Sequence, residues 1–182
     1  MQEYDPRGRP ETYGSFTRWL HWLMAVVLLW QFASAITHQL AEDSPLDEFL
    51  WASHKSVGAL LMALIVIRIL WSLATARQRP APVSGLARLG HWAMYALLLA
   101  IPSLALVRQY GSGREFSPFG LPLISGFDGD KIEWMTDLGS NFHSLLAWIL
   151  LVLIVGHIAA AAWHWLTGRK DIFHRMAENK AH

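Results

Sequence analysis

The amino-acid sequence predicts an all-α protein, a membrane-embedded four-helix bundle with both termini in the cytoplasm. Three observations support this prediction. The 182 residues are 53% hydrophobic and include 10 tryptophans. Four apolar runs of about twenty residues are each long enough to cross a hydrocarbon layer of about 30 Å as a helix. Basic residues are also unevenly distributed among the segments that join these runs.

The apolar runs define one membrane domain. They lie near 18–37, 50–74, 86–108 and 140–166. Lipid offers the backbone no hydrogen-bonding partners, so each run is expected to be helical. The first run is longer than a signal-peptide core and lacks a small-residue cleavage site, so we interpret it as a retained span. A transmembrane domain is therefore expected over 16–176, between a flexible cytoplasmic tail at 1–15 and a short C-terminal tail at 177–182.

The distribution of basic residues predicts the orientation. Ten lie in the segments before the first span, between the second and third, and after the fourth: Arg7, Arg9, Arg18, Arg77, Arg79, Arg88, Arg169, Lys170, Arg175 and Lys180. Four lie in the other two loops and their helix ends: Lys55, Arg108, Arg114 and Lys131. By the positive-inside rule this asymmetry puts both termini in the cytoplasm. The localisation expected is the bacterial inner membrane, where the chain contacts lipid.

The absence of cysteine narrows the possible chemistry. Without cysteine there are no disulfides, thiolate-held clusters, covalently attached haem or cysteine nucleophiles. Any metal must be held by histidine or oxygen. No nucleotide-binding glycine motif or helical HExxH is present, and no nucleic-acid partner is expected. The long connection at about 109–139 contains the apolar segment FSPFGLPLISGF, which favours a lid packed on the membrane surface.

Four histidines in the apolar runs are the principal functional candidates. His143 and His157 are fourteen residues apart, a spacing that keeps two helical residues within about 40° of one face and about 21 Å apart along the axis. His54 enters the second span at the depth of His143. His21 lies toward the inner side, as does His157. Two b-type haems stacked across the bundle require such pairs, because each iron takes one imidazole from either side.

Each candidate ligand is followed four residues later by a small residue that leaves space for a porphyrin: Ala25, Gly58, Ala147 and Ala161. For any one histidine, a hydrogen-bonded core residue is the alternative interpretation. His164 is the alternative to His157, but it would separate the two irons by about 31 Å, nearly the full hydrocarbon thickness. We therefore favour His157.

Arg68 repeats the fourteen-residue spacing after His54, at the depth of His157. A haem propionate would give this buried guanidinium an anionic partner. The alternative is an arginine that extends to the inner interface. His91 and His164 either line a quinone or proton site or are solvated by headgroups. His38, His174 and His182 are assigned no function. The outer basic residues either neutralise propionates or steer a small anion to the outer haem.

Several motifs resemble those of the bacterial cytochrome b-561 family of four-helix dihaem membrane proteins. They are RWLHW (18–22), SHKSVG (53–58) with Arg68 following, LARLGHWAMYALLLAIP (86–102), NFH (141–143) and GHIAAAAWH (156–164), which is followed by IFHRM. The resemblance covers nearly all of residues 15–176. In that family the haem ligands fall at positions matching His21, His54, His143 and His157.

The resemblance implies an oxidoreductase that takes electrons from superoxide at the periplasmic side and passes them to ubiquinone in the respiratory chain. Lys55, Arg114 and Lys131 are then the residues expected to guide superoxide to the outer haem. The alternative is a haem-b electron-transfer subunit that docks on a periplasmic dehydrogenase or hydrogenase. A transporter without haem is disfavoured, because its broken helices and acidic pathway residues are missing.

Overall fold

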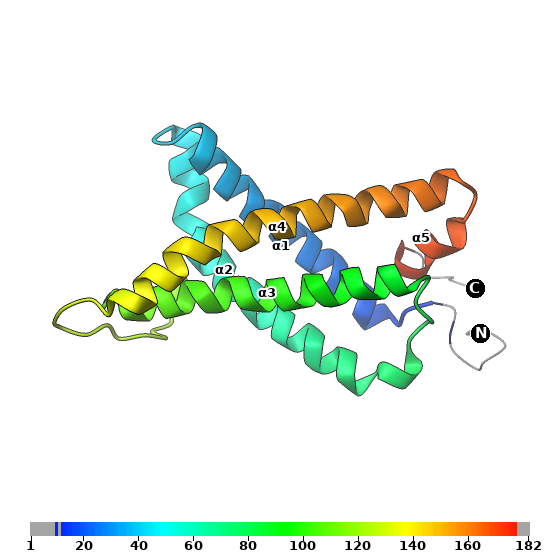
Figure 1. Cartoon of the computed structure of the whole chain (residues 1–182), viewed down its shortest axis with the longest axis horizontal. Helices are drawn as coiled ribbons and strands as arrows, with labels where there is room; N and C mark the ends of the chain where they lie inside the picture. The colour runs from blue at the N-terminus through cyan, green and yellow to red at the C-terminus, as the bar shows by residue number, and fades with distance from the viewer. Residues whose placement is uncertain (1–9, 11, 178–182) are drawn as a thin grey trace.

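The computed structural model describes residues 10 and 12–177, and within them it is helical, with no β-strand (Figure 1). The four long helices are α1 (Ser15–Leu40), α2 (Pro45–Ala74), α3 (Gly85–Gly111) and α4 (Glu133–Leu166). The shorter elements are η1 (Ala76–Gln78), η2 (Pro118–Gly120) and α5 (Lys170–Ala177). All four long helices are long and apolar enough to cross a membrane. This confirms the predicted fold class, while the orientation of the termini stays a prediction.

The long helices form two hairpins. α1 packs along α2, α3 packs along α4, and α2 contacts α3. In Figure 1 the α1–α2 hairpin crosses the α3–α4 hairpin obliquely. The loops within the two hairpins define what we call the loop end of the molecule. The opposite end, where α1 begins and α4 is followed by α5, is called the terminal end.

Short polar residues fix where α2 and α3 begin. The Ser44 hydroxyl accepts a hydrogen bond from the Asp47 backbone N–H at 3.1 Å, and Pro45 occupies the first turn. Ser84 caps α3 in the same way, accepting from Ala87 N–H at 3.1 Å. These caps satisfy amide groups that the first helical turn leaves unpaired. The loop within the first hairpin is therefore short and well defined.

Two glycines allow α3 and α4 to approach closely near the loop end. A Cβ on Gly139 would collide with the Arg108 side chain and the Leu104 carbonyl oxygen. A Cβ on Gly111 would collide with Met135. Larger residues at these positions would push α3 and α4 apart. They would also displace His143, which lies one turn beyond Gly139 on α4.

The buried core is a layer of aliphatic side chains from all four long helices. Its members are Leu20, Met24, Val27, Leu61, Leu64, Ile65, Leu98, Ile101 and Leu150. On α2 this layer lies between His54 and Arg68, and on α4 it lies between His143 and His157. Val152, Val155 and Ile158 of α4 are more than half exposed, as expected for lipid-facing side chains. The core thus separates the two candidate histidine sites.

The long α3–α4 connection folds back on the end of α3. Phe116 pairs with Ile124 in an isolated bridge, and the Phe127 ring lies 5.8 Å from that of Tyr110. Three apolar side chains at its outer surface remain more than 60% exposed: Phe119, Leu121 and Leu123. Their exposure agrees with a lid that rests on a membrane surface, which stays a prediction.

At the terminal end, α5 contacts the beginning of α1. The Trp22 indole N–H donates to the Met176 carbonyl at 3.0 Å, and the Tyr13 N–H donates to the Arg175 carbonyl at 3.2 Å. The sequence predicted the fourth span to end near residue 166 and predicted no separate helix after it. The predicted tails at 1–15 and 177–182 lie mostly outside the described residues.

Candidate functional site

The structure brings the four candidate histidines together as two pairs. At the loop end, the rings of His54 on α2 and His143 on α4 have centroids 6.5 Å apart with planes inclined by 72°. At the terminal end, His21 on α1 and His157 on α4 have ring centroids 6.3 Å apart, also at 72°. We call these the loop-end pair and the terminal-end pair. The ring that faces His21 is that of His157, not that of His164.

The spacing within each pair fits one metal ion between two imidazoles. Rings bound on opposite sides of one ion, with metal–nitrogen bonds of about 2 Å, have centroids about 6 Å apart. Both pairs match this separation, and both join a histidine of the first hairpin to a histidine of α4. A haem iron held by two histidines would be bound in this way, by His54 and His143 at the loop end and by His21 and His157 at the terminal end.

Hydrogen bonds at the loop-end pair select the tautomer suited to metal binding. The His143 Nδ1–H donates to the Ile101 carbonyl at 3.0 Å. The Ser34 hydroxyl donates to the Gln31 carbonyl at 2.7 Å, so it accepts from His54 Nδ1–H, also at 2.7 Å. With Nδ1 protonated in both rings, each Nε2 presents a lone pair. Oxygen acceptors at Nδ1 are the usual partners of metal-binding histidines.

Gln31 lies against the nitrogen that would bind the metal. Its amide N–H donates to His54 Nε2 at 3.0 Å and to the His54 carbonyl at 3.1 Å. The same amide lies 3.4 Å from where a Cβ on Gly58 would be, so it fills the space beside that small residue. Its Oε1 atom is buried without a hydrogen-bond partner among the described residues. Metal binding at His54 therefore requires the Gln31 side chain to move away from Nε2. In its new position the Gln31 Oε1 atom would need a hydrogen-bond donor.

Arg68 lies at the terminal-end pair. Its Nε–H donates to the Tyr95 hydroxyl at 3.1 Å, and its Nη2 atom lies 3.5 Å from His21 Nδ1. The Nη1 atom is buried and has no hydrogen-bond partner within the described part of the chain. An arginine inside a membrane span is costly when its donors are unpaired. The guanidinium thus has an unpaired N–H donor, and a carboxylate such as a haem propionate would accept a hydrogen bond from it.

A second arginine and a tyrosine add hydrogen-bond donors to the terminal end. Arg79 Nε donates to the Thr75 hydroxyl at 3.4 Å, and its Nη2 atom is buried without a partner in the residues described. Tyr13, which precedes α1, is within electrostatic reach of Arg79 and Arg68. Burial raises the pKa of the Tyr13 hydroxyl above its usual value, so it stays a neutral donor. These groups are suited to binding carboxylates rather than cations.

His91 of α3 lies beside the terminal-end pair. Its ring centroid is 5.6 Å from that of His157, with the planes inclined by 64°. The structure therefore places His91 next to a candidate ligand, whereas it does not join His91 and His164 in one site. A quinone or proton site lined by both histidines stays a prediction that these contacts do not support.

The basic residues predicted to attract an anion lie at the loop end, and all three are exposed: Lys55, Arg114 and Lys131. Lys55 Nζ donates to the Gln109 side-chain oxygen at 3.1 Å. The Gln109 amide in turn donates to the Arg114 carbonyl at 3.2 Å. Gln109 thus links two of the three residues, while Lys131 extends from the end of the same loop.

No function was predicted for His38 from the sequence. The structure stacks its ring on that of Trp51, with centroids 3.8 Å apart, and Trp51 contacts His54 at 4.5 Å. The sequence contains one sign of this contact, because Trp51 and His54 are three residues apart and share a helix face. It does not reveal that the loop would fold His38 back onto Trp51.

Paired histidines in a four-helix membrane domain define the class of a membrane cytochrome, and similarity to known proteins identifies the family. Residues 12–179 match the family described as prokaryotic cytochrome b561. The chain is 32% identical over 178 residues to "Cytochrome b561 homolog 2" of Escherichia coli strain K12, with 92% of each chain covered. It is 27% identical over 170 residues to "Probable superoxide oxidase CybB" of Yersinia pestis, covering 88% of this chain and 93% of that protein.

The chain therefore belongs to the prokaryotic cytochrome b561 family. Membership and the four apolar helices identify a multi-pass protein of the bacterial inner membrane that transfers electrons with haem b. The family resemblance noted in the sequence is confirmed.

Proposed function

We propose that this protein is a dihaem cytochrome that oxidises superoxide at the loop end, on the periplasmic side, and reduces ubiquinone. The observation that supports this best is the pair of histidine sites, both at iron-bridging separation and stacked on either side of one aliphatic core. A relative described as a probable superoxide oxidase supports the choice of donor.

In this proposal each histidine pair holds one haem b. His54 and His143 bind the loop-end haem, and His21 and His157 bind the terminal-end haem. When bound, the two haems supply one-electron carriers within the membrane. Arg68 would orient the terminal-end haem by donating a hydrogen bond to a propionate from its unpaired Nη1 atom. Ser34 and the Ile101 carbonyl keep the loop-end imidazoles in the metal-binding tautomer.

The basic residues at the loop end attract the donor. With two histidines holding each haem, the metal would have no free coordination position for a substrate. The chain must therefore concentrate a small anion near the site without binding it to a metal, and exposed cations do so through long-range attraction. Lys55 is next to the ligand His54, and Gln109 holds its ammonium group near the backbone of Arg114.

The overall reaction balances as two one-electron oxidations against one two-electron reduction. Each superoxide ion loses one electron and becomes dioxygen. Ubiquinone takes up two electrons and two protons and becomes ubiquinol. The purified protein in detergent or liposomes should therefore form one ubiquinol for every two superoxide ions it consumes.

The experiment that tests the donor compares two charge-removing variants. Lys55→Gln should slow reduction of the protein by superoxide several-fold without altering its absorption spectrum, and added salt should reduce the difference. Arg88→Gln removes another exposed charge, at the terminal end, and should leave the rate unchanged. Stopped-flow absorption spectroscopy measures both rates.

Two results would contradict superoxide as the donor. One is a wild-type protein that superoxide does not reduce. The other is equal rates in wild type and Lys55→Gln at every salt concentration. Either result would favour the alternative, an electron-transfer subunit that docks on a periplasmic dehydrogenase or hydrogenase, and reduction by such a partner would then be measured.

A further inference from the structure

Three aromatic rings form a continuous stack at the loop end. The His38 ring, in the last turn of α1, lies 3.8 Å from the Trp51 ring with the two planes only 9° apart. Trp51 lies 4.5 Å from the ring of His54, inclined by 32°. Trp51 is exposed and His38 is half-buried, while His54, also half-buried, faces the ring of His143. The stack thus leads from the surface to one candidate axial ligand.

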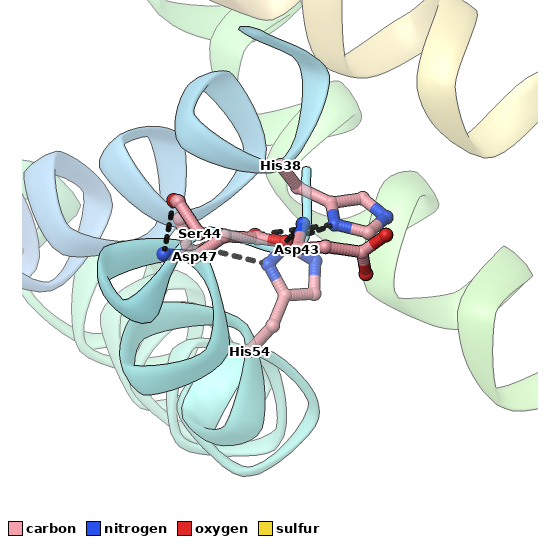
Figure 2. A network of polar contacts seen from close by, with 6 residues as sticks. His38, Asp43, Ser44, Asp47 and His54 are labelled. Atoms are coloured by element: carbon pink, nitrogen blue, oxygen red, sulfur yellow. Dashed lines mark hydrogen bonds and ion pairs between the residues drawn. The ribbon is translucent and has the colours of Figure 1, made fainter. Parts of the chain in front are cut away.

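A buried carboxylate anchors the outer end of this stack. Asp47 is only 4% exposed, and its carboxylate accepts from His38 Nδ1–H at 3.1 Å and from the Asp43 backbone N–H at 3.2 Å. The Asp43 backbone has a positive φ of 60°, which folds the short loop around this carboxylate. Figure 2 shows these contacts together with the ring of His54. Burial of the Asp47 carboxylate would be costly without these hydrogen bonds. Because breaking the bond to His38 carries this cost, the contact holds the His38 ring in place.

The ring stack limits rotation of the His54 imidazole, a motion that its hydrogen bond alone does not prevent. An axial imidazole can turn about its bond to the metal, and a single hydrogen bond at Nδ1 tolerates a range of ring orientations. His54 has such a bond to Ser34. A large aromatic ring packed against the imidazole restricts the remaining freedom, because rotation would drive the ring into the Trp51 indole.

The terminal-end pair has a different environment. His21 is flanked by Trp22 at 5.4 Å and by the Arg68 guanidinium, and no parallel ring stack is present there within the described residues. The difference between the two ends makes the loop-end stack a device specific to one of the two sites.

We propose that Trp51 and His38 are positioning residues for the loop-end axial ligand, fixing the plane of the His54 imidazole through a ring stack anchored on Asp47. This proposal rests on the proposed haem binding by His54 and His143. The orientation of the two axial imidazole planes determines the anisotropy of the paramagnetic signal of a ferric bis-histidine haem. It also influences the reduction potential through the strength of the metal–ligand bonds.

The experiment uses low-temperature electron paramagnetic resonance of the oxidised holoprotein, with a redox titration of each variant. Trp51→Leu should shift the largest g-value and the midpoint potential of the loop-end haem, and leave both values of the terminal-end haem unchanged. Trp51→Phe keeps a ring against His54 and should restore most of the wild-type signal. Trp134→Leu removes an exposed tryptophan near the same end and should change neither haem.

Two variants test the anchor independently of the tryptophan. His38→Ala and Asp47→Asn should each move the loop-end signal in the same direction as Trp51→Leu, and by a smaller amount. They remain informative if Trp51→Leu does not accumulate in the membrane. A double variant, His38→Ala with Trp51→Leu, should show no larger shift than Trp51→Leu alone, because His38 acts through the tryptophan.

The outcomes distinguish this proposal from the function on which it rests. Wild-type protein without a loop-end haem signal would overturn the proposed haem binding and the positioning role together. A normal wild-type signal that stays unchanged in Trp51→Leu and in His38→Ala would overturn the positioning role and leave the proposed function intact. Equal shifts in Trp51→Leu and Trp134→Leu would also overturn it.

Discussion

The loop-end and terminal-end pairs have nearly the same geometry and opposite surroundings. Their ring separations differ by only a few tenths of an ångström, and their planes are inclined by the same angle. At the loop end both Nδ1 atoms meet oxygen acceptors, Ser34 and the Ile101 carbonyl. At the terminal end His21 Nδ1 faces the Arg68 guanidinium, which donates hydrogen bonds and carries positive charge.

This difference has consequences for affinity and for redox properties. Oxygen acceptors at Nδ1 raise the basicity of the ligand and stabilise the oxidised, more positive metal. A neighbouring cation disfavours the oxidised state, and a guanidinium at Nδ1 favours the tautomer with a proton on Nε2, which cannot bind the metal. The loop-end histidines are therefore expected to bind haem more readily than the terminal-end histidines. The loop-end haem is also expected to have the lower reduction potential. Electron transfer from the loop end to the terminal end would then be favourable.

The largest expected effect comes from removing a ligand. His54→Ala or His143→Ala should each abolish the loop-end haem and keep the terminal-end haem, so that the haem content falls by half. A pyridine haemochrome assay with protein quantification measures this. His164→Ala, which changes a histidine outside both pairs, should retain the full content. Loss of only the terminal-end haem from either loop-end variant would contradict the pairing.

The second effect tests whether the hydrogen bond from His54 to Ser34 prepares the loop-end site for haem binding. Ser34→Ala removes the acceptor of His54 Nδ1–H and should weaken binding of the loop-end haem about tenfold. Transfer of haem from the protein to apomyoglobin, followed optically, reports this change. Ser103→Ala is the matched control, because among the described residues that hydroxyl donates to the Leu99 carbonyl of its own helix and to no other group. Equal haem loss in both variants would mean that the Ser34 contact does not prepare the site.

The third effect tests the positive charge at the terminal end. Arg68→Leu should lower the reduction potential of the terminal-end haem by about 60 mV, which corresponds to about 1.4 kcal/mol for one electron. The direction follows because loss of a nearby cation favours the oxidised iron. Arg68→Lys keeps the charge and should show a smaller shift. Unchanged potentials in an optical redox titration of Arg68→Leu would favour an arginine that only reaches toward the interface.

The helices and the histidine pairs could be predicted because few physical constraints determine them. Lipid requires helices of a known length, and helical geometry then fixes the depth of each histidine from its position in the span. His157 could be preferred over His164 on the rise per residue alone, and the structure turns the ring of His157 toward His21. The ligand roles themselves stay predictions.

The parts that could not be predicted depend on tertiary contacts between distant segments. The loop at 41–44 brings Asp47 against His38, and nothing in either helix pattern requires that pairing. The Arg68–Tyr95 contact joins residues of α2 and α3, which pack according to side-chain shapes rather than periodicity. The contact of α5 with Trp22 likewise depends on how the chain turns back after α4.

The most direct test of the account is the haem stoichiometry of the wild-type protein. Purified in mild detergent and assayed as the pyridine haemochrome against an amino-acid analysis, the protein should contain two b-type haems per polypeptide. That value follows from two histidine pairs with the same iron-bridging separation. A value of one haem, or none, would contradict the central claim that both pairs are metal sites.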